Sequence, residues 1–114
     1  MELRYSQLEN NIGLIKLIGK LDIVGVGEIE NQFASYCAGE NPRVLVDLSE
    51  VDFLASIGIR MLTLNAKSVV SRGGRMIMLH PTPDVRHVLE VTGIPAIIPI
   101  YEGLESAQTV LLAE

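Results

Sequence analysis

The polar side chain best placed for chemistry is that of Ser56, because it stands where an apolar, strand-like segment gives way to a helical pattern. Residues 47–59 are expected to end a strand, turn and begin a helix, with Ser56 as the N-cap. A serine hydroxyl at an N-cap accepts a hydrogen bond from a first-turn N–H and stabilises the helix by about 1 kcal/mol. A purely structural role is therefore the first interpretation of Ser56.

The same position also suits a phosphate group. A phosphoserine carries a charge of about −1.5 to −2 at neutral pH. Free N–H groups at the positive end of a helix dipole stabilise an anion placed there. Phosphorylation of Ser56 is therefore the second interpretation, with Ser49 in the expected turn and Ser68 in mid-helix as weaker acceptors.

Apolar residues occupy two sides of the helix expected at residues 57–72. On a wheel of about 100° per residue, one arc must face the sheet; it contains Ile59, Leu62, Ala66, Val69 and Val70. The opposite side carries Ile57, Met61 and Leu64 beside Ser68. This second strip fits a docking surface for a partner, but cover by another helix of the chain or simple exposure explains it equally well.

Residues for catalysis or for a cofactor do not converge in the sequence. His80 and His87 have no cysteine or carboxylate at metal-ligand spacing, and neither a nucleophile elbow nor a Walker loop is present. Residues 25–27, Gly-Val-Gly, resemble the start of a dinucleotide fingerprint, but Glu30 stands where the third glycine belongs. We expect no catalytic residue, cofactor or metal; a small enzyme or nucleotide-binding protein remains the third class of interpretation.

Composition narrows the class of protein further. The 114 residues, 48% apolar and 20% charged, fit one folded domain spanning residues 1–114. Acidic residues outnumber basic ones by 14 to 9 without a basic run, so nucleic acid is not an expected partner. The single cysteine, the lack of a signal-peptide core and the lack of a run of about 20 apolar residues predict a cytoplasmic protein without direct membrane insertion.

The elements that must position Ser56 follow from hydrophobic periodicity. Extended segments at 3–8 and 12–18, separated by Glu-Asn-Asn at 9–11, predict an antiparallel hairpin. After residue 20, helices and strands alternate. The expected elements are a helix containing Ile29, Phe33 and Tyr36 that ends before Gly39 and Pro42, a strand at 43–48, a helix at 57–72, a strand at 76–79, a helix at 84–91, a short strand near 97–98 and a helix at 103–112. The fold class is α/β, with a mixed sheet of about five strands and about four helices.

The segment around Ser56 resembles the signature of the STAS family, the sulfate-transporter and anti-sigma-antagonist domain. In that family a strand ends in Asp-Leu-Ser and is followed by Val-x-Phe-x-Asp-Ser-x-Gly-Leu. Here residues 47–49 read Asp-Leu-Ser and residues 51–59 read Val-Asp-Phe-Leu-Ala-Ser-Ile-Gly-Ile, with Ala55 in place of the usual acid. Residues 19–22, Gly-Lys-Leu-Asp, are similar to the family's Gly-x-Leu-Asp, so the resemblance covers nearly the whole chain.

The resemblance implies roles for individual residues. Ser56 would be the serine that a partner kinase phosphorylates, and Asp22 would lie near it on the surface that faces the kinase. Gly58 would permit a close backbone approach in the first turn of the helix. Together with the apolar strip, the expected partner-binding residues are Asp22, Ile57, Gly58, Met61 and Leu64.

The resemblance also implies a function, which is regulatory and not enzymatic. Small members of the family act as anti-sigma factor antagonists: the unphosphorylated protein binds an anti-sigma factor that is also a serine kinase. Phosphorylation, here of Ser56, releases the complex, and a metal-dependent serine phosphatase restores it. The alternative is a constitutive STAS scaffold subunit of a membrane-associated ATPase complex of the lipid-transport type, in which Ser56 only caps its helix.

Overall fold

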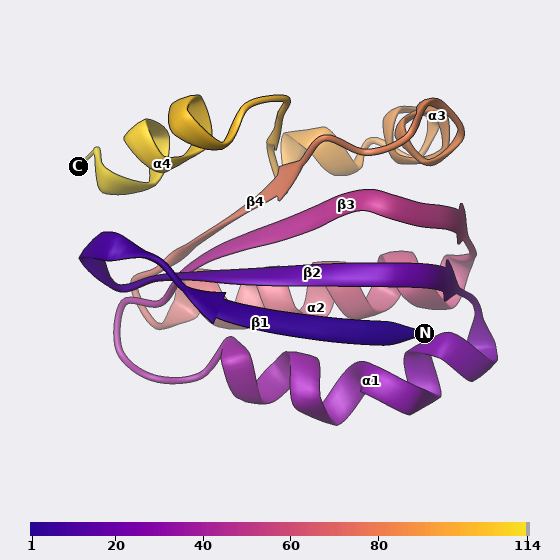
Figure 1. Cartoon of the computed structure of the whole chain (residues 1–114), viewed down its shortest axis with the longest axis horizontal. Coiled ribbons are helices and arrows are strands. Elements are labelled where there is room, and N and C mark those ends of the chain that lie inside the picture. Colours follow the sequence, from indigo (N-terminus) through magenta and orange to yellow (C-terminus); the bar gives the residue numbers. More distant parts are fainter. Residues whose placement is uncertain (114) are drawn as a thin grey trace.

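A computed structural model describes residues 1–113 as one five-stranded sheet with α-helices on both of its faces (Figure 1). The strands stand in the sheet in their sequence order, β1-β2-β3-β4-β5. The elements are β1 (Glu2–Gln7), η1 (Glu9–Asn11), β2 (Ile12–Leu21), α1 (Ile23–Tyr36), β3 (Arg43–Leu54), α2 (Ser56–Ser71), β4 (Arg75–Leu79), α3 (Pro83–Val91), η2 (Ile94–Ala96), β5 (Ile100–Tyr101) and α4 (Leu104–Leu112), where η marks a 3-10 turn.

The N-terminal hairpin is confirmed. β1 pairs antiparallel with β2, from Glu2 opposite Ile18 to Gln7 opposite Gly13. Both asparagines of the connecting turn, residues 10 and 11, have positive φ angles of 63° and 61°, a conformation that asparagine adopts more readily than most residues. The remaining strand pairs are parallel, so the predicted mixed sheet with an antiparallel edge is confirmed.

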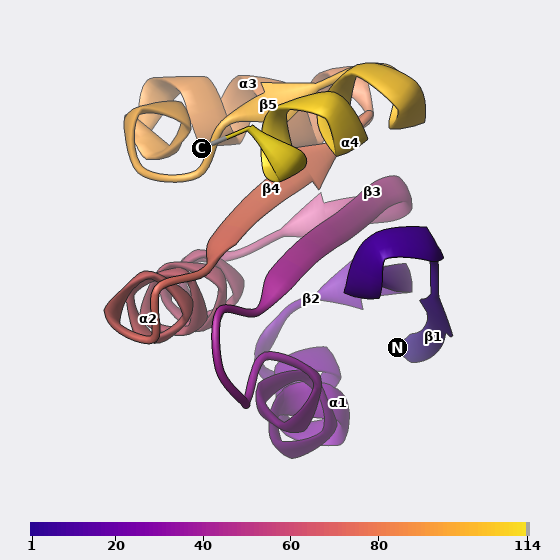
Figure 2. The same ribbon diagram turned by 90° about the vertical axis from the view of Figure 1, so that its left-hand side faces the viewer.

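Side chains alternate between the two faces of the sheet, as the period of a strand requires. In β3, Val44 and Val46 join the larger core with Phe33 of α1 and Leu62 of α2. The intervening Leu45 lies on the other face, in a smaller core beneath α4. Figures 1 and 2 show α4 on the opposite side of the strands from α1 and α2. None of these helices is long and apolar enough to cross a lipid bilayer within the described part of the chain.

The third strand is longer than the sequence indicated. It was expected at residues 43–48, followed by a turn, but it runs from Arg43 to Leu54. After register shifts near Ile18 and Lys20, its second half continues to pair with β2. Irregular pairing of this kind disturbs the regular alternation by which a strand is recognised from sequence. The turn expected after residue 48 is therefore wrong.

The fifth strand is displaced from its expected place at residues 97–98. Gly93, with a φ of 76°, ends α3, and η2 begins directly after it. Ile98 is fully buried but belongs to this turn, because its N–H donates to the carbonyl of Ile94 at 2.8 Å. The strand follows at Ile100–Tyr101. In place of the strand expected near residues 97–98 there is therefore the end of a 3-10 turn that buries Ile98.

Cys37 is buried in the core, and His80 lies beside a carboxylate. Cys37 is 1% exposed, and desolvation raises the pKa of its thiol to about 12, so the thiol remains protonated at neutral pH. His80 places Nδ1 3.0 Å from a carboxylate oxygen of Glu102. Among residues 1–113, no three histidine, cysteine or acidic side chains gather closely enough to hold a metal ion.

Candidate functional site

Ser56 lies at the edge of the sheet where the parallel strands β2 and β3 end and helices α1 and α2 begin. The backbone N–H of Ala55 donates to the carbonyl of Leu21 at 3.0 Å, which joins the ends of the two strands. The carboxyl edge of a parallel sheet is the usual place for binding sites in α/β proteins. The fold thus brings Ser56 next to the start of α1.

Ser56 is not the N-cap, so that prediction is wrong by one residue. Ala55 is the last extended residue, with φ −94° and ψ 169°, and its carbonyl accepts from Gly58 and Ile59 at 3.0 and 3.2 Å. The bond from Ala55 to Leu21 holds Ala55 in extended backbone just after the strand, so the helix begins at Ser56. Within residues 1–113 the Ser56 hydroxyl makes no hydrogen bond, and α2 has no side-chain cap. The hydroxyl is exposed and available to another molecule.

Asp22 has the capping role that was expected of Ser56. It is the N-cap of α1, and its Oδ1 accepts a hydrogen bond from the N–H of Gly25 at 2.8 Å. It directly follows Leu21, which bonds to Ala55, so the structure places Asp22 and Ser56 at the same edge. The carboxylate is half-buried, and one of its oxygens is already engaged.

Gly58 allows a close approach, but to the strands of its own chain. A Cβ at this position would lie 2.9 Å from the Leu21 carbonyl oxygen and 2.9 Å from Cδ1 of Leu54. Only glycine lets the first turn of α2 pack so closely against the ends of β2 and β3. Gly58 is buried, so it positions the start of α2 and does not contact solvent.

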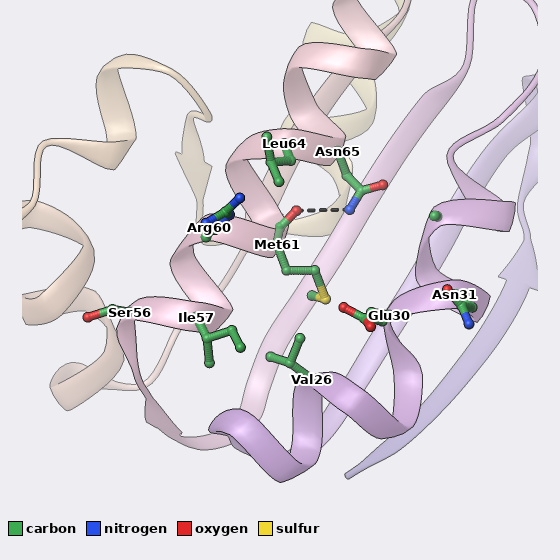
Figure 3. A pocket seen from close by; sticks show the side chains of 10 residues that line it. Val26, Glu30, Asn31, Ser56, Ile57, Arg60, Met61, Leu64 and Asn65 are labelled. Carbon is green, nitrogen blue, oxygen red and sulfur yellow. Dashed lines mark hydrogen bonds between the residues drawn. The ribbon is translucent and has the colours of Figure 1, made fainter.

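The apolar strip predicted on α2 divides into exposed and buried members. Ile57 is 36% and Leu64 is 54% exposed, whereas Met61 is 6% exposed because α1 covers it. Figure 3 shows Met61 extending between the two helices towards Val26. Of the alternatives left open for the strip, cover by another helix therefore applies to Met61, and exposure applies to Ile57 and Leu64. The sheet-facing arc also needs a correction, since Val70 is 62% exposed.

A groove separates α1 from α2 and ends at Ser56 (Figure 3). We call it the α1–α2 groove; its volume is about 640 Å³. Its apolar lining includes Val26, Ala34, Ile57, Met61 and Leu64, and its charged lining residues are Glu30 and Arg60. The exposed residues of the predicted strip, Ile57 and Leu64, thus form part of the α2 wall of this groove.

Sequence reasoning missed three exposed apolar residues at the same edge. Ile23 and Val24 open α1 and are 73% and 66% exposed, and Phe53 near the end of β3 is 48% exposed. Together with Ile57 they form what we call the apolar rim. A signal was available at Ile23 and Val24, because the first turn of a helix favours acidic residues over large apolar ones.

Alanine substitutions at neighbouring positions of α2 separate the buried and exposed members. Met61→Ala is expected to lower the free energy of unfolding by about 2 kcal/mol, because it leaves a cavity beneath α1. Leu64→Ala should change it by about 0.5 kcal/mol or less, since that side chain remains half in water. Urea denaturation followed by circular dichroism measures both values. Equal losses would contradict the assignment of Met61 to the core.

Comparison with known proteins agrees with this geometry. A family model for the STAS domain matches residues 6–107. BtrV from Bordetella bronchiseptica, provisionally named an anti-sigma factor antagonist, is 29% identical over 91 residues, which are 80% of this chain and 78% of that protein. These sequence matches extend well beyond the segment around Ser56.

Solved structures share the fold at low identity. An anti-sigma factor antagonist from Mycobacterium paratuberculosis superimposes with a TM-score of 0.87 at 22% identity, covering 98% of this chain and 94% of that one. SpoIIAA of Bacillus superimposes with TM-scores of 0.76 unphosphorylated and 0.70 phosphorylated, each at 20% identity over 96% of this chain and 96% or 99% of SpoIIAA. Since the family model runs from β1 into α4, the chain belongs to the STAS domain family.

Proposed function

We propose that this protein is an anti-sigma factor antagonist that works by partner switching. In its unphosphorylated form it binds an anti-sigma factor that is also a serine kinase. The observation that carries the proposal is the exposed Ser56 hydroxyl at the uncapped start of α2, at the same edge of the sheet as the apolar rim. The relatives named as anti-sigma factor antagonists support the same role.

The apolar rim supports a protein partner over a small substrate. Its side chains are large and solvent-exposed, and they lie at the same edge of the sheet as Ser56. Exposed apolar clusters of this kind mark protein interaction sites. A non-enzymatic, cytoplasmic regulator fits this arrangement.

The residues inferred from the sequence take different parts in this proposal. Ile57 and Leu64 are exposed and would contact the partner directly. Asp22 would contribute through its outer carboxylate oxygen. Gly58 and Met61 are buried and would act by holding α2 in place beneath the interface.

Phosphorylation of Ser56 would end the complex without refolding the antagonist. The phosphate would lie at the start of α2, where free N–H groups and the helix dipole stabilise an anion. It would also stand four residues before Arg60, a spacing that lets two side chains on a helix meet. At the interface, however, the dianion would have to lose its water beside Ile57, which is strongly unfavourable unless a cation pairs with it. A metal-dependent serine phosphatase would reverse the modification.

The rim gives a direct test of the proposed function. Phe53→Ala is expected to weaken binding of the cognate anti-sigma factor at least about tenfold, because aromatic side chains are enriched at the cores of protein interfaces and Phe53 is 48% exposed in the free protein. Isothermal titration calorimetry with the cognate anti-sigma factor measures the change. Val70→Ala is the matched control, since Val70 is 62% exposed at the far end of α2 and should bind like wild type. Equal affinities for all three proteins would argue against the rim as the interface.

A further inference from the structure

The α1–α2 groove has features that the proposed function does not use. Its floor is apolar: Val26 and Met61 are almost fully buried there, and Leu64 stands half-exposed on the α2 side. Figure 3 shows Glu30 reaching from α1 towards α2 above this floor. Neither Glu30 on the first helix nor Arg60 on the second forms an ion pair within residues 1–113. The groove thus presents an apolar floor between two unpaired charges of opposite sign.

The dimensions of the groove fit one face of a helix. On α2 its lining runs from Ser56 to Asn65, which at the rise of an α-helix spans about 13.5 Å. The apolar side chains of an amphipathic helix recur at i, i+3 or i+4 and i+7, which spans about 10 Å. Two turns of a partner helix therefore match the length of the groove.

The charges of Glu30 and Arg60 favour an amphipathic helix in the groove over an apolar small molecule or a second copy of this chain. An apolar molecule with an anionic head would pair with Arg60 but would bring its charge into the groove that also holds Glu30. A second copy of this chain, with a formal net charge of −5, would be repelled. A helix with a basic side chain on one flank and an acidic side chain on the other can pair with both Glu30 and Arg60.

We propose that the α1–α2 groove receives an amphipathic helix of the anti-sigma factor, with a basic side chain facing Glu30 and an acidic one facing Arg60. This binding mode rests on the function proposed above. Ser56 lies at one end of the groove with its hydroxyl pointing away from the other labelled side chains (Figure 3). A phosphate there would stand one helical turn before Arg60 and would compete with the partner's acid for it. Arg60 thereby couples the state of Ser56 to occupancy of the groove.

A pair of tryptophan variants on α1 tests the groove. Ala34 lines it and is exposed, so Ala34→Trp fills the groove without disturbing the core and should weaken binding of the anti-sigma factor at least about tenfold. Ser35→Trp, one residue further and outside the groove, should bind within about twofold of wild type.

A charge exchange tests the partner. Arg60→Glu should weaken binding several-fold, and replacing the acid on the facing partner helix with lysine should restore it. The facing helix is located as the segment of the anti-sigma factor that hydrogen exchange shows to be protected in the complex. Lys67→Glu, an equal charge change on α2 outside the groove, is the control and should not be rescued by the same partner variant.

Each result decides between the two proposals. If Ala34→Trp binds like wild type while Phe53→Ala binds weakly, the groove proposal is overturned and the proposed function stands. An extended instead of a helical protected segment in the partner would contradict the proposal that a helix binds in the groove. A dimer of the chain alone that Ala34→Trp breaks would show that a second copy binds there instead. If wild type does not bind the anti-sigma factor at all, both proposals fail.

Discussion

Gly25→Ala is expected to lower the free energy of unfolding by about 3 kcal/mol, at the upper end of the usual range for overpacking. A Cβ at Gly25 would lie 2.0 Å from the carbonyl oxygen of Lys20 and 3.3 Å from Oδ1 of Asp22. The first contact is with backbone that β2 holds in place, so it cannot move aside cheaply. The second contact would disturb the cap of α1, because the Gly25 N–H donates to the same oxygen.

Gly27→Ala supplies the matched control two residues away. Nothing lies within 4 Å of a Cβ at Gly27, and the residue is exposed on α1. Alanine at such a helical position should stabilise the protein by about 0.5–1 kcal/mol, because it restricts the unfolded chain. Urea midpoints at unchanged slope give both free energies. A loss of stability in Gly27→Ala, or none in Gly25→Ala, would show that α1 does not pack on β2 as described.

Gly25 shows the difference between features of the fold that local sequence patterns predict and those that depend on tertiary contacts. Local periodicity predicted the hairpin, the alternation of strands and helices and the mixed sheet, because each depends on a repeat within a few residues. The length of β3 depends on its irregular pairing with β2, which no local pattern contains. The tight contact of Gly25 with Lys20 is likewise tertiary, so residues 25–27 could be interpreted from sequence only by comparison with a nucleotide-binding motif.

The sequence also predicted only those parts of the candidate site that depend on local patterns. Ser56 and Ile57 were recognised because the strand-to-helix transition is visible in the sequence. A helical wheel shows which residues of α2 share a side, but it does not show that α1 covers Met61. Phe53 was missed because its exposure follows from the twist and extension of β3 to Leu54.

The largest functional effect is expected from phosphate on Ser56. Phosphorylated protein should bind the anti-sigma factor at least about 100-fold more weakly than unphosphorylated protein. The phosphate dianion would lose its water when the partner covers the apolar rim, which is unfavourable. Arg60 would also pair with the phosphate instead of with the acidic side chain of the partner helix. Stability should change little, because Ser56 is exposed and the start of α2 accommodates an anion. Ser56→Ala should bind the partner like wild type and should not be released by ATP.

Intact mass after incubation with ATP and the cognate kinase identifies the modified residue. Wild type should gain one phosphate, about 80 Da, and Ser56→Ala should gain none. Ser49→Ala and Ser68→Ala serve as matched controls and should be modified like wild type, because both residues are less exposed than Ser56. Phosphate that persists in Ser56→Ala would move the acceptor to one of these serines. An unmodified wild type that still binds its partner, with a kinase shown to be active on another substrate, would favour the constitutive scaffold, in which the exposed hydroxyl of Ser56 has no regulatory part.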